Sequence, residues 1–299
     1  YMNVLGAKDN LEFAIAEREA IQQQLEQTRQ RFEVGLTAIT DVHEAQARYD
    51  LAVASEIDAN NQVAVSTEIL REITGQPFGE LAPLAEQTPL VSPDPEEINA
   101  WVTTALERNL LLLAAEKAMD ASRYGLSVAR AGHYPTLDLT ADYTNTDSTG
   151  GQFGTNERDG TTIGVVLNIP IYSGGRTSAI SYEAAALHQR SKELYELQRR
   201  TTEREARNAY LTTLANISRV KAYKQAVVSQ ETALEATKAG YDVGTRTAVD
   251  VLNSQRELFL SQRDYARARY DYILETLRLK QAAGTLTDED LERINSWLY

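Results

Sequence analysis

Two short stretches of the sequence gather charged and polar side chains around a glycine. FEVGLTAITDV occupies positions 32–42, and YDVGTRTAVDV occupies positions 241–251. Each begins with an aromatic residue, an acid and Val-Gly, and each reaches Asp-Val six residues after the glycine. Gly35 and Gly244 are typical of tight turns, and Asp41 and Asp250 stand where the N-caps of the following helices are expected. The charged and polar side chains at these two turns could therefore bind a partner through ionic contacts and hydrogen bonds.

The residue types needed for covalent or metal chemistry are scarce. The chain has no cysteine, so it offers neither disulfides nor thiolate ligands. Its three histidines, His43, His133 and His188, share no metal-ligand spacing. The stretch TGGQFG leads into no helix start, as a phosphate-binding loop would. We therefore predict no enzymatic activity, no cofactor and no metal site.

Composition narrows the possible partners. The 299 residues include 30 basic and 43 acidic side chains, and the formal net charge of −13 argues against nucleic acid as a partner. The opening YMNVLGAKDNLEF has no basic segment followed by an apolar run, so no signal peptide is visible. No stretch of 18 apolar residues is present either. A role in a membrane would therefore have to use strands.

An internal repeat relates the two turns. Residues 1–75 align without a gap to residues 210–284, so that Gly35 pairs with Gly244 and Asp41 with Asp250. A gap-free register of this length predicts a duplicated helical hairpin. A helix, a strand pair and another helix precede the second copy, whereas nothing comparable precedes residue 1. We therefore expect that about 110 further residues, including any signal sequence, belong before it.

Helix-forming and helix-breaking residues set the predicted boundaries. Residues 176–239 contain neither Gly nor Pro, and as one helix would be about 95 Å long. Residues 251–283 repeat apolar side chains every seven positions, which is typical of coiled-coil-like packing. The predicted parts are a first hairpin (1–75, tip 33–41), a proline-rich linker (76–100), a helix (101–134), a strand hairpin (135–172, loop 147–160), a second hairpin (173–284, tip 241–250) and a C-terminal segment (285–299).

Two segments change to a period of two. TLDLTADYT alternates apolar residues with Asp and Thr, and TIGVVLNIPIY alternates isoleucine, valine and leucine with smaller or polar residues. The length and the pattern fit strands in the wall of a transmembrane barrel. They fit a soluble hairpin with one wet face equally well, and the strands alone do not decide between the two.

Several motifs in order carry a family resemblance. GHYPTLDLTADY, IPIYSGG, AYKQAVV, GYDVGTRTAVDVLNSQ and FEVGLTAITDV together resemble the TolC family of outer-membrane efflux and secretion channels, over essentially the whole chain. The resemblance implies a homotrimer in which each protomer gives four strands to a shared β-barrel, with an α-helical barrel in the periplasm that narrows at the hairpin tips. It also implies outer-membrane lipid, a periplasmic adaptor and an inner-membrane pump as partners. This fragment, with two strands, is not expected to form the pore unaided.

The resemblance assigns a latch to the tips. It implies polar contacts from Tyr241 and Arg246 on the second hairpin to Thr40 and Asp41 on the first, which hold the channel closed. An Arg–carboxylate contact is directional, and an exposed one is weak enough to be reversible. The alternative is that Tyr241 only packs and that Asp41 only caps its helix.

The resemblance also implies a constriction. In a trimer Asp250 would form a ring of carboxylates, which favours cations. The family pattern has a second acid one turn later, where this chain has Asn253, so the charge of the ring is expected to be weaker.

Three aromatic residues are candidates for the membrane interfaces: Tyr143, Phe153 and Tyr172.

The predicted fold class is therefore mainly α, with long helical hairpins and a two-strand barrel segment. The predicted function is a passive exit duct of a tripartite efflux or type I secretion system, with most of the chain in the periplasm. Two other classes remain open, namely a periplasmic adaptor and a soluble coiled-coil scaffold. An adaptor would need one hairpin and small β-domains, and a scaffold would be soluble without detergent.

Overall fold

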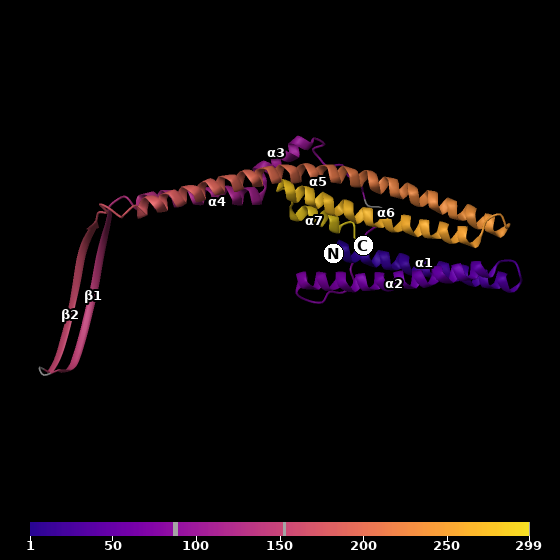
Figure 1. Cartoon of the computed structure of the whole chain (residues 1–299), viewed down its shortest axis with the longest axis horizontal. Coiled ribbons are helices and arrows are strands. Elements are labelled where there is room, and N and C mark those ends of the chain that lie inside the picture. The colour runs from indigo at the N-terminus through magenta and orange to yellow at the C-terminus, as the bar shows by residue number, and fades with distance from the viewer. Residues whose placement is uncertain (86–88, 152–153, 299) are drawn as a thin grey trace. The chain divides into compact units, whose positions relative to one another are not determined.

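The computed structural model describes residues 1–85, 89–151 and 154–298, and it is mostly helical (Figure 1). The elements are α1 (Met2–Glu33), α2 (Ile39–Thr74), α3 (Ile98–Arg108), α4 (Leu110–Ala131), β1 (Thr136–Gly151), β2 (Gly154–Asn168), α5 (Arg176–Asp242), α6 (Ala248–Ala283) and α7 (Asp288–Asn295). They form two compact units, one of residues 1–109 and 202–299 and one of residues 110–201. The predicted class, mainly α with long hairpins and one strand pair, is confirmed.

The first unit contains two antiparallel hairpins that match residue for residue. α1 and α2 form one, and the second part of α5 forms the other with α6 (Figure 1). α2 and α6 each have 36 residues and begin and end at positions that the repeat relates. Both end in a left-handed glycine, Gly75 and Gly284, each with φ of 69°. The tip glycines also have positive φ, 75° at Gly35 and 79° at Gly244, which explains why each tip needs glycine.

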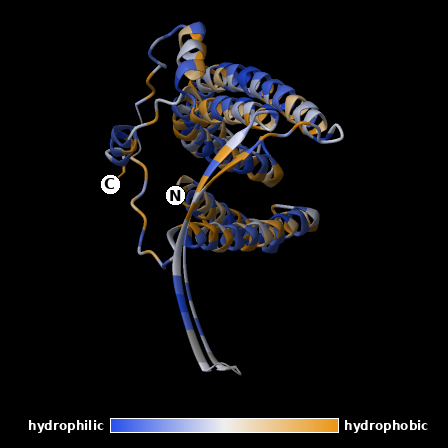
Figure 2. Ribbon diagram, turned by 90° about the vertical axis from the view of Figure 1, so that its left-hand side faces the viewer, coloured by the Kyte–Doolittle hydropathy of each residue, from blue (hydrophilic) through white to orange (hydrophobic). Residues whose placement is uncertain are grey.

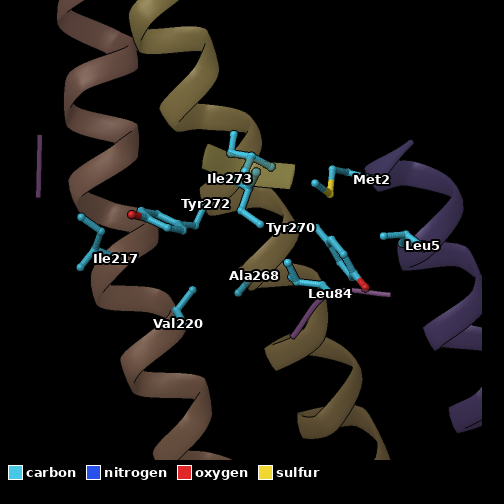
Figure 3. Packing of buried hydrophobic residues seen from close by; sticks show 10 residues of the cluster. Met2, Leu5, Leu84, Ile217, Val220, Ala268, Tyr270, Tyr272 and Ile273 are labelled. Atoms are coloured by element: carbon cyan, nitrogen blue, oxygen red, sulfur yellow. The ribbon is translucent and has the colours of Figure 1, made fainter. Parts of the chain in front are cut away.

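A hydrophobic core joins the two hairpins. Tyr270, Tyr272 and Ile273 of α6 are buried and lie between side chains of α1 and α5 (Figure 3). The Tyr272 hydroxyl accepts a hydrogen bond from the Val91 N–H at 2.8 Å, which attaches the proline-rich segment to this core. The heptad pattern of α6 is confirmed at Val251, Leu258, Tyr272 and Leu279, which are all buried. The repeated apolar column thus packs the helix laterally, as coiled-coil seams do.

Two boundaries differ from the prediction. The helix expected over 101–134 is interrupted at Asn109, whose backbone is extended and which separates α3 from α4. The Asn109 side-chain amide donates to the Ala282 carbonyl oxygen at 3.0 Å, so a contact with α6 stabilises the break. The C-terminal segment, for which no helix was predicted, contains α7. It begins with a capping box between Thr287 and Asp290.

The second unit contains α4, the first part of α5 and the β1–β2 ribbon. The Ser122 hydroxyl of α4 and Nδ1 of His188 on α5 are hydrogen-bonded at 3.0 Å. The ribbon is antiparallel, and β1 reaches Gly151 while β2 starts at Gly154. The expected loop at 147–160 is therefore wrong for most of its length, because its polar residues continue the ladder, as in the pairs Asp147 with Glu157 and Asn145 with Asp159.

The register of the ribbon places most apolar residues of both strands on one face, while Val166 lies opposite Asp138 on the other. Three directly opposed pairs on the apolar face are Leu137 with Leu167, Leu139 with Val165 and Ala141 with Ile163. The large apolar side chains of this face are exposed in the chain. Figure 2 shows that the hydrophobic colour is confined to the part of the ribbon next to the helices, whereas the far part is hydrophilic.

Within the part of the chain that the structure describes, no helix combines the length and the apolar character required to cross a membrane.

Candidate functional site

The tip of the second hairpin is organised by a capping box. Thr247 is the N-cap of α6, and its N–H donates to Asp250 Oδ2 at 2.9 Å. In return, the Asp250 N–H donates to Thr247 Oγ1 at 3.2 Å. The expectation that Asp250 is itself the N-cap is therefore wrong by three positions, because the residue lies at N3, where an acid completes the box.

The tip of the first hairpin is capped differently. Its N-cap position is Ala38, which has no side-chain oxygen to offer. Asp41 lies at the third helical position, as Asp250 does, and its carboxylate accepts a hydrogen bond from the Thr37 hydroxyl. Asp41 is thus held locally, but it too is not the N-cap.

The charge of Asp250 is favoured by its surroundings. Hydrogen bonds from the Thr247 N–H and then from the Thr247 hydroxyl lower the pKa of the Asp250 carboxyl, and the nearby charge of Arg246 acts in the same direction. The residue is partly exposed in the first turn of α6, at the N-terminus, where the helix dipole also favours a negative charge. Asp250 therefore remains ionised at any pH near neutrality.

The four latch residues do not meet within one chain. Among the described residues, no hydrogen bond or ion pair joins Tyr241 or Arg246 to Thr40 or Asp41. Arg246 and Thr40 are exposed instead. Tyr241 is only 9% exposed, and the guanidinium of Arg31 lies 4.2 Å from the centre of its ring. The structure thus brings the two tips together through a residue that the sequence analysis did not select.

Asn253 also has a partner that the sequence analysis missed. Arg48 on α2 donates from Nη2 to Asn253 Oδ1 on α6 at 3.4 Å. The side chain of Asn253 is therefore turned toward the first hairpin. The repeat alignment could not reveal this contact, because it relates equivalent positions and not neighbours in space.

Two ion pairs support the tips from further along the helices. Glu17 on α1 pairs with Arg263 on α6 and so joins the two hairpins. Arg18 on α1 pairs with Glu56 on α2 at 2.5 Å and so joins the two arms of the first hairpin. The hydrogen bond from Arg18 to Glu56 raises the pKa of the arginine. Scattered charges of this kind resemble solvated helix faces in the sequence, and only the packing identifies them.

At the ribbon, two of the three aromatic candidates are placed. Tyr143 and Tyr172 are both well exposed, while Phe153 lies outside the described residues. Among the described residues, no group of three or more His, Cys, Asp or Glu side chains is arranged to hold a metal ion.

Comparison with known proteins identifies relatives over the whole length of the chain. The outer membrane efflux protein family matches residues 1–76 and 101–285. Outer membrane protein TolC of Vibrio cholerae is 43% identical over 301 residues, covering 100% of this chain and 69% of that protein. The alkaline protease secretion protein AprF of Pseudomonas aeruginosa is 31% identical, covering 98% of this chain and 62% of that protein.

A solved structure shows the same fold. The outer membrane protein VceC of Vibrio cholerae superimposes with a TM-score of 0.78 at 20% identity, covering 95% of this chain and 67% of that one. The chain thus spans about two thirds of the length of the relatives it matches. These relatives are described as outer-membrane and secretion proteins, and the family is not one of enzymes. The chain therefore belongs to the outer membrane efflux protein family.

Proposed function

We propose that this chain is part of a passive exit duct in the outer membrane, the outer-membrane component of a tripartite drug-efflux or type I secretion system. The observation that carries the proposal is the exposed apolar face of the β1–β2 ribbon. A face with leucine, valine and isoleucine on both strands, backed by Asp138, Thr140 and Asp142, is the pattern of a barrel wall.

The size of this face supports a position in a bilayer. The apolar row of β1 runs from Leu137 to Tyr143, six residue steps that span about 20 Å at 3.3 Å per residue. The lipid-facing band of outer-membrane barrels is about 25 Å tall. The hydrophilic far part of the ribbon then lies beyond the lipid. Tyr143 and Tyr172 lie near the two interfaces between the membrane and water.

The ribbon also requires other strands. Both of its outer edges carry backbone groups that have no partner in a two-stranded sheet, and such edges are not tolerated in hydrocarbon. We propose that three copies of a longer protein close one barrel. Exposed apolar side chains on α2, including Leu51, Ile57 and Ile69, support lateral association of the helices as well.

We place the gate of the duct at the hairpin tips. Arg246 and Thr40 are exposed and Asp41 is half-buried, so they are available to a neighbouring copy. In this proposal the tip of one protomer's second hairpin, with Arg246 and Tyr241, contacts Thr40 and Asp41 of the next protomer's first hairpin. An exposed contact of this type is weak, about 0–1 kcal/mol, so partners can open it.

Asp250 and Asn253 line the constriction in this proposal. Three copies of the Asp250 carboxylate favour cations there. Asn253 adds no charge and accepts a hydrogen bond from Arg48, so the ring holds one acid per protomer. A periplasmic adaptor and an inner-membrane pump act at the same tips, and the relation to a protease secretion protein supports secretion as one use of the duct.

The ribbon can be tested with a matched pair of substitutions. Leu139→Arg places a charge on the apolar face, and Thr140→Arg places the same charge on the opposite face of the same strand. In a full-length protein that carries this chain, we expect Leu139→Arg to abolish a trimer extracted from outer membranes by detergent, and Thr140→Arg to preserve it. If the protein is recovered without detergent, or if both substitutions are tolerated, it is a soluble scaffold or an adaptor and the duct is excluded.

The latch is tested in planar bilayers with a full-length channel that carries this chain. Arg246→Ser should raise the resting conductance because it removes the cation of the contact between protomers. Lys238→Ser, on α5 before the turn that holds Arg246, is the control for the loss of a positive charge. An unchanged conductance in Arg246→Ser would remove Arg246 from the gate.

A further inference from the structure

The two tips carry different residues at some positions that are equivalent in the repeat. Arg31 in the first tip corresponds to Gly240 in the second, and Phe32 corresponds to Tyr241. Phe32 is 40% exposed, whereas Tyr241 is 9% exposed. The same position in the two hairpins is therefore open to solvent in one and covered in the other.

Tyr241 is held through its ring rather than its hydroxyl. The ring belongs to an apolar cluster of the second hairpin with Leu234, Ala248, Val251 and Leu258. Its hydroxyl is buried and has no hydrogen-bond partner among the described residues. The guanidinium of Arg31, from the first hairpin, lies over the ring at 4.2 Å, well within the range of a cation–π contact.

The position of Arg31 explains why a cation is favoured there. It lies in the last turn of α1, where a positive charge complements the helix dipole. Tyr241 lies in the last turn of α5, which has no basic residue of its own. Arg31 therefore brings its charge to the carboxyl end of a second helix as well as its own.

Glycine at position 240 completes the arrangement. A Cβ atom there would lie 2.8 Å from Cγ of Arg246 and 3.2 Å from Oγ1 of Thr245. Arg246 thus lies across the site that a side chain at 240 would occupy. The second hairpin has no side chain of its own equivalent to Arg31, and Arg31 of the first hairpin occupies the face of Tyr241.

We propose that Arg31 is a positioning residue of the gate, which holds the two hairpins of one protomer together by stacking on the ring of Tyr241. The inference rests on the proposed duct, and it changes the part assigned to Tyr241. The ring face makes a contact within one protomer, while Arg246 serves the contact between protomers. Opening then requires the first and second hairpins of each protomer to separate at this stack.

Bilayer recordings of the full-length channel separate the ring from the hydroxyl. Tyr241→Phe keeps the ring and should leave the resting conductance within about twofold of wild type. Tyr241→Leu and Arg31→Gln should each raise it by about threefold to tenfold, the range that corresponds to a partly desolvated cation–π contact. The double variant should exceed neither single variant by more than about twofold, because both remove one contact.

Arg29→Gln is the matched control. Arg29 lies two residues earlier on α1 and donates to Gln46 Oε1 of α2 at 2.6 Å, so its loss removes an arginine without touching the stack. A conductance in Tyr241→Phe as high as in Tyr241→Leu would show that the hydroxyl matters and would overturn the inference. So would an unchanged conductance in Arg31→Gln.

The contact between Arg31 and Tyr241 can also be tested in the chain itself, without a conducting channel. In the NMR spectrum of the purified chain, the Arg31 guanidinium should be shifted upfield by the ring current. The shift should persist in Tyr241→Phe and disappear in Tyr241→Leu. If the shift is present but no variant forms a conducting channel, the proposed function fails and the contact stands as a structural one. If the shift is absent from the wild-type chain, the inference fails whatever the conductance.

Discussion

Glu17 on α1 and Arg263 on α6 form an ion pair between the two hairpins, and the Glu17 side chain is only 10% exposed. Because removing one partner leaves the other charge poorly solvated, we expect Glu17→Gln to lower the free energy of unfolding by about 2 kcal/mol. Glu19→Gln, which removes an exposed acid from the same helix, should change it by less than about 0.5 kcal/mol. Chemical denaturation measures both. Equal stabilities for the two variants would contradict a structural role for the pair.

The two helix-ending glycines offer a test of the contact between α3 and α6. Gly75 and Gly284 share a φ of 69°, but a Cβ atom at Gly284 would lie 2.3 Å from the Arg108 carbonyl oxygen, whereas one at Gly75 would meet nothing within 4 Å. We expect Gly75→Ala to cost about 1–2 kcal/mol, from the backbone conformation alone. Gly284→Ala should cost at least about 2 kcal/mol more, because the backbone of the adjoining segment must move.

Thermal or chemical unfolding of the two variants measures that difference directly. Since the two glycines occupy equivalent positions of the repeat and both have left-handed backbones with φ of 69°, each serves as the control for the other. A cost at Gly284 no larger than at Gly75 would mean that the loop after Arg108 adapts freely.

Asp290 gives the attachment of α7 a dependence on pH. Burial alone would raise the pKa of Asp290, but hydrogen bonds from Lys280 and from the Thr287 N–H outweigh it and lower the pKa. A lowered pKa in the folded state contributes stability above the unfolded value of about 3.9, and this stability is lost as the pH falls through the folded value. We therefore expect α7 to detach only below about pH 4.

Hydrogen exchange across residues 285–298 at pH 3 and at pH 6 tests this dependence. Asp290→Asn should expose the segment at both values, because its amide cannot replace the carboxylate against Lys280 and Arg293. Asp288→Asn, an exposed acid in the same helical turn, should behave as wild type. Protection at pH 3 equal to that at pH 6 in the wild-type chain would refute the titration of Asp290.

Asp250 should keep its charge well into the acid range. Its lowered pKa implies that the cation preference of the proposed constriction holds down to about pH 4 and declines only below it. Asp250→Ala should reduce this preference at every pH. Thr247→Val removes the hydroxyl that donates to the carboxylate, so the preference should decline at a higher pH than in the wild type.

Reversal potentials in a salt gradient, measured from pH 3 to pH 7, report the selectivity. An unchanged reversal potential in Asp250→Ala would remove the residue from the constriction. A pH profile in Thr247→Val identical to that of wild type would mean that the capping box does not set the charge of Asp250.

Much of the fold could be predicted because its signals are local and repeated. The 64 residues without Gly or Pro are part of a single helix of 67 residues, and the repeat predicts two hairpins whose second helices have the same length. The break at Asn109 could not be predicted, because asparagine is no strong helix breaker and the contact that stabilises it comes from Ala282. The strands extend further than predicted because their polar ends pair with each other.

The two turns of the candidate site were predictable, but the contact made by Tyr241 within the chain was not. Gly35 and Gly244 lie in turns where the sequence indicated them, and within one chain the Tyr241 ring contacts Arg31. The contacts to Thr40 and Asp41 stay a proposal. A signal for Arg31 does exist in the repeat, since it stands opposite a glycine in the other copy. Interpreting that difference requires knowledge of which hairpin faces which, and this depends on packing between distant segments.

The pairing of Leu137 with Leu167 has a consequence for assembly. Side chains alternate along a strand, so a slip of one residue between β1 and β2 would reverse the faces of one strand. Asp138 and Asp142, or their neighbours on β2, would then lie on the apolar face. Such a misaligned ribbon would be unfavourable in hydrocarbon but tolerated in water. In the proposed duct, the bilayer would therefore select for correct strand alignment, because only the correctly paired ribbon could enter it.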